Sequence, residues 1–353
     1  MSVENVPSDG ATMRAAAGGG YAGKLPSEIG TDYTFKRRIV WKNAVGFLLL
    51  HLIGFYGIYL VFTSAYLATF IFMFTLVAVS GEGVTIGAHR LYSHKAFKAT
   101  RLLKFILIIA QTIAGENCMY IWVRDHRLHH KYSDTDADPH NAHRGFFFSH
   151  MGWLMSKKHP AVIEKGKLID MSDLEADDLV MFQKKYYKPL YFVFAMFLPI
   201  ATPVWLWNES LYNSFIINFF TRYVLILHIT WSVNSVAHFF GTKPFDRFML
   251  PVESYFVSFV TFGEGWHNYH HTFPWDYRAS ELGARFSVTT HLIDMLAWLG
   301  LAYDLKTALE STIENRCRRT GDGSHPKYGH HVEEKKEGKL EEVHLRHRMS
   351  ALG

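Results

Sequence analysis

The sequence has few of the residues that build disulfide-bonded domains or cysteine-based metal sites. Among its 353 residues there are only two cysteines, Cys118 and Cys317. Two widely separated cysteines exclude a disulfide framework and a zinc site built on cysteine ligands. The sequence also lacks a glycine-rich phosphate loop and a C-x-x-C-H haem motif. Chemistry that depends on either motif is therefore not predicted.

Both ends of the chain lack long apolar segments. Residues 1–24, MSVENVPSDGATMRAAAGGGYAGK, are small or polar and contain no apolar core of a signal peptide. The last forty residues are rich in charge, which predicts at most a solvated helix. We expect a disordered cytosolic tail over residues 1–34, one membrane-embedded domain over residues 35–322, and a charged cytosolic tail over residues 323–353.

Charged residues are scarce within four long apolar stretches, although the chain as a whole carries a net charge of +5. Apolar residues make up 49% of the sequence and aromatic residues 16%. Each stretch approaches the length of about 20 residues that a helix needs to span a bilayer. The four stretches are residues 39–62, 65–88, 189–207 and 214–233. Buried helices of a soluble enzyme are the alternative, but the charges that flank the stretches favour an all-α, polytopic membrane protein.

Lysine and arginine residues predict the orientation of these helices. The loops TSAY and NESLYN, one inside each pair of stretches, contain no lysine or arginine. Basic residues flank the outer ends of the pairs, within residues 36–42, 90–104, 184–188 and 243–247. By the positive-inside tendency, both termini and a helical cap lie in the cytosol. The stretch at 102–114 is too short to span, so it lies either at the membrane interface or in the core of the cap.

Nine of the 21 histidines gather near the cytosolic ends of these stretches or in the cap. They are His89, His94, His126, His129, His130, His238, His267, His270 and His271. In HRLHH and HNYHH, the i, i+3, i+4 spacing directs three rings towards one side of a helix. Neutral imidazole binds iron, zinc, copper or nickel without adding negative charge. Nine ligands exceed the roughly four to six positions of one ion, so they predict a dinuclear site.

Two questions about these clusters stay open from spacing alone. His89 and His94 are about 140° apart on an ideal helix, so they meet only if the helix bends or ends, or if they face two ions. Zinc also accepts imidazole, although a catalytic zinc usually has three protein ligands. Residues 134–141, DTDADPHN, are not a calcium loop, because Pro139 and Gly145 stand where glycine and glutamate are needed. Its acids are expected to cap a helix or to support the ligands. Structural roles are expected for His51, His159, His228 and His291.

The boxes HRLYSH, HRLHHKYSDTDADPHN and GEGWHNYHHTFPWDYR, with NSVAH between the last two, resemble those of the membrane-bound fatty acyl-CoA desaturases of animals, and of insects most of all. The resemblance covers roughly residues 35–322. It implies four transmembrane helices under a cytosolic cap in the endoplasmic reticulum. It also implies removal of two hydrogens from a saturated C14–C18 acyl-CoA. The implied cofactors and partners are two iron ions, O2, membrane lipid, and cytochrome b5 with its NADH reductase, and no nucleic acid.

The same resemblance implies roles for individual residues. One iron would be held by His89, His94, His126, His130 and His270. The other would be held by His129, His238, His267 and His271, and by a water on Asn234. Contacts to the headgroup are implied for Asn43, Asn117, Arg124, Asp125, Lys157, Lys158 and Trp231. Arginine and lysine suit the phosphates of coenzyme A.

The chain departs from this family pattern at Glu82, which lies inside the second apolar stretch. Glu82 precedes His89 by seven residues, about two helical turns, so we predict that both lie on nearly the same face. An ionisable residue at such depth is a functional candidate. We hypothesise that Glu82 and Val77 line the acyl tunnel and affect chain length or double-bond position. The alternative is that Glu82 reaches a basic partner at the cytosolic rim.

Several functional alternatives remain open. LPVE, residues 250–253, occupies a short variable motif and combines features of Δ9-type and Δ11-type, pheromone-forming desaturases. A membrane di-iron fatty acyl hydroxylase uses similar histidine boxes. A metal transporter is a further alternative, but it would place ionisable residues along a path through the membrane. Here the histidine clusters are predicted to lie at one side.

Overall fold

The computed structural model describes residues 21–329, which are mostly helical. Four segments are long and apolar enough to cross a membrane: residues 41–63, 67–93, 187–207 and 211–239. They coincide with the four predicted apolar stretches, although the second and fourth extend further along the chain. The predicted class, an all-α polytopic membrane protein with four spans, is confirmed.

Three of the four spans change their winding along their length. The first is the single helix α1 (Trp41–Thr63). The second is α2 (Leu67–Glu82), which continues as the π-helix η3 (Gly83–Ser93). The third span contains α9 (Tyr187–Tyr191), π-helix η6 (Phe192–Phe197) and α10 (Leu198–Trp207). The fourth span contains α11 (Leu211–Phe215), π-helix η7 (Ile216–Thr221), α12 (Arg222–Asn234) and α13 (Val236–Phe239). A π-helix bonds each N–H to a carbonyl five residues back, so successive side chains follow a different angle from those of an α-helix.

Glycines allow close approach at two of the helix contacts. A Cβ atom on Gly57 of α1 would overlap the hydroxyl of Thr221 in η7. A Cβ atom on Gly83, at the start of η3, would overlap the backbone of Ala110 and Gln111. In membranes, small residues let helix backbones pack together where no hydrophobic effect draws the helices to each other. The position of η3, which carries His89, is therefore set by its contact with the neighbouring helix α3 (Arg101–Ala114).

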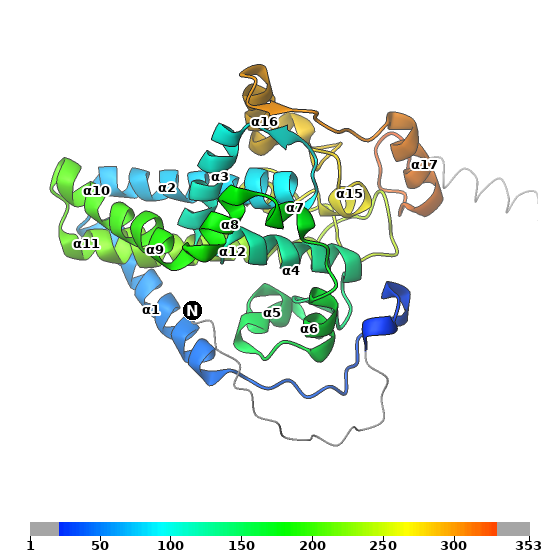
Figure 1. Ribbon diagram of the computed structural model, residues 1–353, viewed down its shortest axis with the longest axis horizontal. Helices are drawn as coiled ribbons and strands as arrows, with labels where there is room; N and C mark the ends of the chain where they lie inside the picture. Colours follow the sequence, from blue (N-terminus) through cyan, green and yellow to red (C-terminus); the bar gives the residue numbers. More distant parts are fainter. Residues whose placement is uncertain (1–20, 330–353) are drawn as a thin grey trace, which may run out of the picture.

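The other helices form a cap at one end of the spans (Figure 1). They are α3, α4 (Met119–Tyr132), α5 (Phe146–His150), α6 (Pro160–Gly166), α7 (Ser172–Glu175), α8 (Asp178–Lys185), α14 (Tyr255–Val260), α15 (His267–Thr272), α16 (Val288–Trp298) and α17 (Glu310–Thr320), with the 3-10 turns η1 (Tyr21–Gly23), η2 (Pro26–Glu28), η4 (Ala142–Arg144), η5 (Gly152–Met155) and η8 (Ala284–Phe286). Strands β1 (Lys98–Ala99) and β2 (Ala302–Tyr303) pair antiparallel.

Helix α3 has two apolar sides with different surroundings. Leu103 and Leu107 are buried, whereas Leu102, Phe105 and Ile106 are exposed. The buried side packs on α2 and η3. An exposed apolar side is typical of a helix that lies in the membrane interface. The sequence left two locations open for this stretch, the membrane interface and the core of the cap. Helix α3 has features of both, because one side packs on the core and the other is exposed and apolar.

The N-terminal segment before the first span differs from the sequence prediction. Residues 21–34 were placed in a disordered tail, yet Ile29 is buried in a cluster of the cap. The backbone N–H of Asp32 donates to Asp136 at 2.8 Å, and that of Asp136 donates to Gly30. The tail was predicted from its polar composition, which does not reveal one buried isoleucine and backbone hydrogen bonds. The parts of both predicted tails at residues 1–20 and 330–353 lie outside the described residues.

Candidate metal centre and cavity

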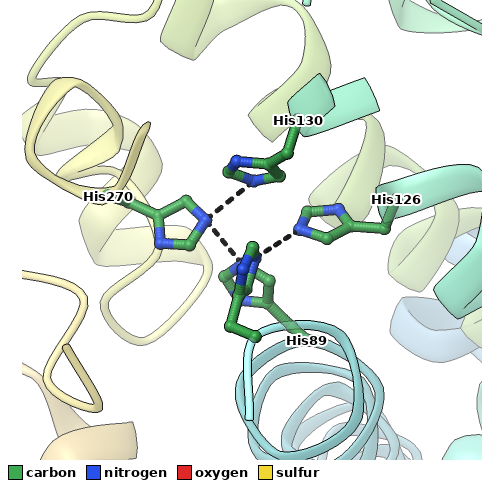
Figure 2. Close-up of side chains that lie close together, drawn as sticks. His89, His126, His130 and His270 are labelled. Carbon is green, nitrogen blue, oxygen red and sulfur yellow. Dashed lines mark hydrogen bonds between the residues drawn. The ribbon is translucent and has the colours of Figure 1, made fainter. Parts of the chain in front are cut away.

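Five histidine rings from three separate segments meet in the first group. Their ligand atoms all lie within 4.8 Å of one another: His89 from η3, His94 just after it, His126 and His130 from α4, and His270 from α15. The Nε2 atoms of His89 and His270 are 2.9 Å apart, and those of His130 and His270 are 3.0 Å apart. Figure 2 shows the labelled rings turned towards a common centre. Spacings this short between imidazole nitrogens suit a shared metal ion.

The winding of η3 answers the question about His89 and His94. The π-helix ends at Ser93, so His94 leaves the helix and its ring lies 5.0 Å from that of His89, between centroids. The Nε2 atom of His94 is also 2.8 Å from that of His126. Both histidines therefore belong to one group, because the helix ends between them.

Four further histidines form the second group. His129, His238, His267 and His271 place one nitrogen each within 4.8 Å of the others. The Nε2 atom of His271 lies 3.1 Å from that of His267 and 3.3 Å from that of His129. The Nε2 atom of His238 is buried and has no hydrogen-bond partner among the described residues. A buried nitrogen without a partner is costly, and a metal ion at this centre would satisfy it.

Carboxylates stand behind the rings on the side away from each centre. The Nδ1 atom of His89 lies 3.0 Å from Glu264, and that of His129 lies 2.8 Å from Asp138. Asp134 is 3.3 Å from Nδ1 of His238. A carboxylate that accepts from Nδ1–H fixes the tautomer and leaves Nε2 as the ligand atom. The acids of residues 134–141 thus lie where the sequence analysis expected them to support ligands.

The surroundings of both groups disfavour the charged form of most of their histidines. Burial, followed by the charges of neighbouring histidines, lowers the pKa of His267, His270 and His271 well below its ordinary value. His129 is an exception: burial would lower its pKa, but the charge and hydrogen bond of Asp138 raise it. Burial would raise the pKa of Glu264, but the charges and hydrogen bonds of Arg90 and His89 lower it to about 2. Neutral rings backed by ionised carboxylates are the protonation states that metal binding needs.

A third set of potential ligands is an extension of the second group. His129, Asp138 and His140 also bring ligand atoms within 4.8 Å of one another. The Nδ1 atom of His140 is 3.3 Å from Asp138, which already faces the Nδ1 atom of His129. His129 itself belongs to the second group, and Asp138 is the carboxylate that supports it. The third set therefore adjoins the second group and is part of the same centre.

An apolar cavity reaches both histidine groups. Its wall includes His89 and His126 of the first group and His129 and His267 of the second. The other lining residues are mainly apolar or hydroxyl-bearing, with Glu264 as the one carboxylate: Val77, Gly81, Val84, Thr85, Trp122, Ile226, Ile229, Thr230, Val233, Asn234, Thr261, Phe262 and Glu264. The predicted tunnel residue Val77 lies in this wall, and so does Asn234, the residue expected to hold a water.

The predicted placement of Glu82 in the tunnel wall is corrected by the structure. Its carboxylate accepts hydrogen bonds from Thr85 at 3.0 Å and Thr289 at 3.2 Å, and it does not line the cavity. The seven-residue spacing to His89 was converted to two α-turns, but most of it lies in the π-helix η3. Glu82 also forms no ion pair with a basic residue in the described part of the chain, so the rim alternative is not supported.

A second cavity in the cap contains three of the seven predicted headgroup residues. Arg124, Asp125 and Lys158 line it, and Asp125 pairs with both basic residues, at 2.7 and 2.9 Å. The other four do not line it: Asn43, Asn117, Lys157 and Trp231. Asn43 donates to the carbonyl of Leu154. Three of the seven residues with an implied headgroup role thus line one cavity, whose wall carries both basic and acidic side chains.

One residue of the interior, Glu116, has a role that the sequence did not predict. Glu116, in the turn between α3 and α4, accepts from Trp122 at 3.2 Å and from Thr230 at 2.7 Å. It thereby holds two side chains of the cavity wall. Its signal in the sequence was a lone acid, GENC, between two apolar segments.

Three histidines outside the metal groups are bonded in series. The Nε2 atom of His228 lies 3.0 Å from His51, and its Nδ1 atom lies 2.9 Å from His150. Because the middle ring uses both nitrogens, the three do not converge on one ion. The structural interpretation of His51 and His228 is consistent with this arrangement.

Four spans, a helical cap, and two buried histidine groups at the end of an apolar cavity define an integral membrane protein with a candidate two-metal centre. The family model for fatty acid desaturases matches residues 64–289. The chain belongs to the fatty acid desaturase family, as the histidine boxes predicted.

Several relatives are similar over most of their length. An acyl-CoA Delta-9 desaturase of Acheta domesticus is 53% identical over 296 residues, covering 84% of this chain and 82% of the relative. An acyl-CoA Delta(11) desaturase of Trichoplusia ni is 51% identical, covering 82% and 83%. A stearoyl-CoA desaturase of Sus scrofa is 50% identical, covering 82% and 80%.

Proposed function

We propose that the protein is an acyl-CoA desaturase, an oxidoreductase that introduces a double bond into a saturated fatty acyl-CoA. The observation that carries this proposal is the meeting of two all-imidazole groups at the wall of one apolar cavity. The names of the relatives support the substrate class. They do not favour a hydroxylase, and they include both Δ9 and Δ11 enzymes, so the position of the double bond stays open.

The donor sets fit two iron ions. Each group supplies only imidazole nitrogens as ligands, and the unpartnered Nε2 atom of His238 points to a missing ligand partner. Two irons bound there would supply the O2-dependent oxidation that removes hydrogen from an unactivated methylene, for which no acid or base suffices. We propose the first iron on the five-histidine group and the second on the four-histidine group, with a water on Asn234.

The residues of this chain bind and place the substrate. Arg124 and Lys158 carry positive charge in the cap cavity, which suits the phosphates of coenzyme A. The apolar wall of the deeper cavity takes up the acyl chain and excludes water. Trp122 and Thr230, both bonded to Glu116, fix the wall near the histidines. Holding the chain in one position relative to the metals is how such a site selects one carbon pair.

The location and the partners complete the proposal. We place the protein in the endoplasmic reticulum membrane, with both termini and the cap in the cytosol. Cytochrome b5 and its NADH reductase would supply two electrons per reaction, and O2 would be the oxidant. We propose residues 35–322 as the catalytic domain. The segment of residues 21–34 packs on this domain. A metal transporter is not supported, because Glu82 is the one acidic residue within the four spans.

Expression in yeast that lacks its own desaturase tests this function. Chromatography with mass spectrometry of the lipids is expected to show new monounsaturated acyl chains. Substitution of His126, His130, His270 or His271 by alanine is expected to abolish them, while the protein still accumulates in the membrane. Hydroxylated acyl chains in place of alkenes, or alkenes formed by the alanine variants, would contradict the proposal.

A further inference from the structure

The carboxylate of Glu82 joins the cavity wall to the cap. Glu82 is the one acidic residue in the four spans, where an ionisable side chain is costly and commonly functional. Its Oε2 atom accepts from Thr85, which lines the cavity. Its Oε1 atom accepts from Thr289, a fully buried residue of α16. Both oxygens thus have a defined partner, and only one of these partners lies in the cavity wall.

The three threonines in the cavity wall all direct their hydroxyl protons away from the cavity. Thr85 donates to Glu82, Thr230 donates to Glu116 at 2.7 Å, and Thr261 donates to a backbone carbonyl one turn back at 2.6 Å. A threonine hydroxyl has only one proton. Once that proton is donated outwards, the threonine cannot donate a hydrogen bond to water or substrate in the cavity. Two of the three outward acceptors are partly buried glutamates, Glu82 and Glu116.

The place of Thr85 in the wall is next to the first histidine group. Thr85 and His89 are four residues apart in η3, and both line the cavity. Under the proposed function, an acyl chain bound in this cavity lies against this part of the wall. The orientation of the Thr85 side chain therefore affects the space and polarity beside the reacting carbons.

We propose that Glu82 is a positioning residue that sets which carbon pair of the acyl chain lies at the metal centre, by holding the Thr85 hydroxyl away from the cavity. This inference rests on the proposed acyl-CoA desaturase activity. Without an acceptor at position 82, the Thr85 hydroxyl turns to the carbonyl of Gly81 or into the cavity. Either change reshapes the wall beside His89 and shifts the register of the bound chain.

The test compares the ratio of double-bond positions in lipids from desaturase-deficient yeast, normalised to total product. Glu82→Leu is expected to change this ratio by about fivefold, the effect of losing one hydrogen bond worth about 1 kcal/mol. Glu82→Gln is expected to keep the wild-type ratio, because its amide oxygen still accepts from Thr85. Glu82→Met, which keeps the length of the side chain without an oxygen, is expected to match Glu82→Leu and replaces it if that variant does not accumulate.

Two further variants separate positioning from a structural link. Thr289→Val removes only the bond to α16 and is expected to keep the wild-type ratio. In a Thr85→Val background, Glu82→Leu is expected to have no further effect, because the hydroxyl that Glu82 holds is gone. An unchanged ratio in Glu82→Leu and Glu82→Met, a shift reproduced by Thr289→Val, or an equal shift in the Thr85→Val background would each overturn the inference. Absence of any alkene from the wild-type chain would instead overturn the proposed function.

Discussion

At the scale of single residues, each histidine group has carboxylates that face its rings from the side away from the centre. Asp138 accepts from Nδ1 of His129 and is fully buried, and it also accepts from the backbone of Asp134. Such a partner raises the basicity of the ring and holds its orientation. Six of the nine histidines stand out in the sequence because imidazoles at i, i+3, i+4 are rare, whereas His89, His94 and His238 have other spacings. The role of Glu264 was not predicted from the sequence, because its partner His89 lies far away in the chain.

Replacement of Asp138 by asparagine is expected to weaken metal binding by about tenfold, because the ring loses its anionic partner. The amount of iron retained by purified protein after dialysis against a chelator measures this effect. Asp170→Asn is the matched control, since Asp170 is exposed and its carboxylate bonds only to the nearby Ser172. Equal iron retention in both variants would contradict the role given to Asp138.

Glu253 gives the protein a dependence of stability on pH. Burial raises its pKa from 4.5 to about 8, although the backbone N–H of Tyr269 donates to it. The folded protein therefore holds a proton between these two values that the unfolded chain releases. The stability contributed by this group is complete below pH 4.5 and is lost as the pH rises to about 8.

Glu253→Gln removes this titration, so the melting temperature of the variant relative to wild type is expected to rise between about pH 5 and about pH 8. Thermal unfolding in detergent at several pH values measures the difference. Glu28→Gln, at an exposed position, serves as the control. A difference that stays constant with pH would contradict the burial of a neutral Glu253.

At the scale of helices, the sequence predicted the spans well and their winding poorly. A span is fixed by the apolar length that matches the bilayer, which composition reports directly. The π-helix η3 depends on which carbonyls its N–H groups reach while it packs on α3, and no local pattern in GVTIGAHRLYS reports that. The predicted placement of Glu82 is wrong for this reason, while Val77, which precedes the π-helix, does line the cavity.

Gly83→Ala is expected to destabilise the fold by about 1–3 kcal/mol, because its Cβ would overlap the backbone of α3. The displacement of η3 would also move His89, so iron content should fall together with the melting temperature. Gly46→Ala in α1 is the control, since a Cβ there has no atom within 4 Å. Similar melting temperatures for the two variants would contradict the close contact between η3 and α3.

At the scale of the whole molecule, the account requires that the hairpin loops and the cap lie on opposite sides of the membrane. Both natural cysteines are buried, so introduced cysteines report the topology. Ser64→Cys, in the first loop, is expected to react with an impermeant maleimide only after the vesicles are permeabilised. Lys131→Cys, exposed in the cap, is expected to react in sealed microsomes. Labelling of both positions without permeabilisation would contradict this arrangement.

The overall arrangement could be predicted because hydropathy and basic flanks act over whole segments. The cap was predicted as helical, but its internal contacts could not be predicted, since they join residues that are far apart in sequence. Residues 21–34 pack on the loop that supports the second histidine group, through Asp136. Likewise, only three of the predicted headgroup residues line one cavity. The direction of each side chain decides whether it lines the cavity, and the sequence does not give that direction.

The central claim is that the two histidine groups each hold one iron ion. The most direct measurement is the metal content of the purified, active protein by mass spectrometry, for wild type and for His270→Ala and His267→Ala. The account predicts about two irons per chain in the wild type and a loss of iron, together with activity, in either variant. Full activity with a single iron, or with zinc and no iron, would contradict it.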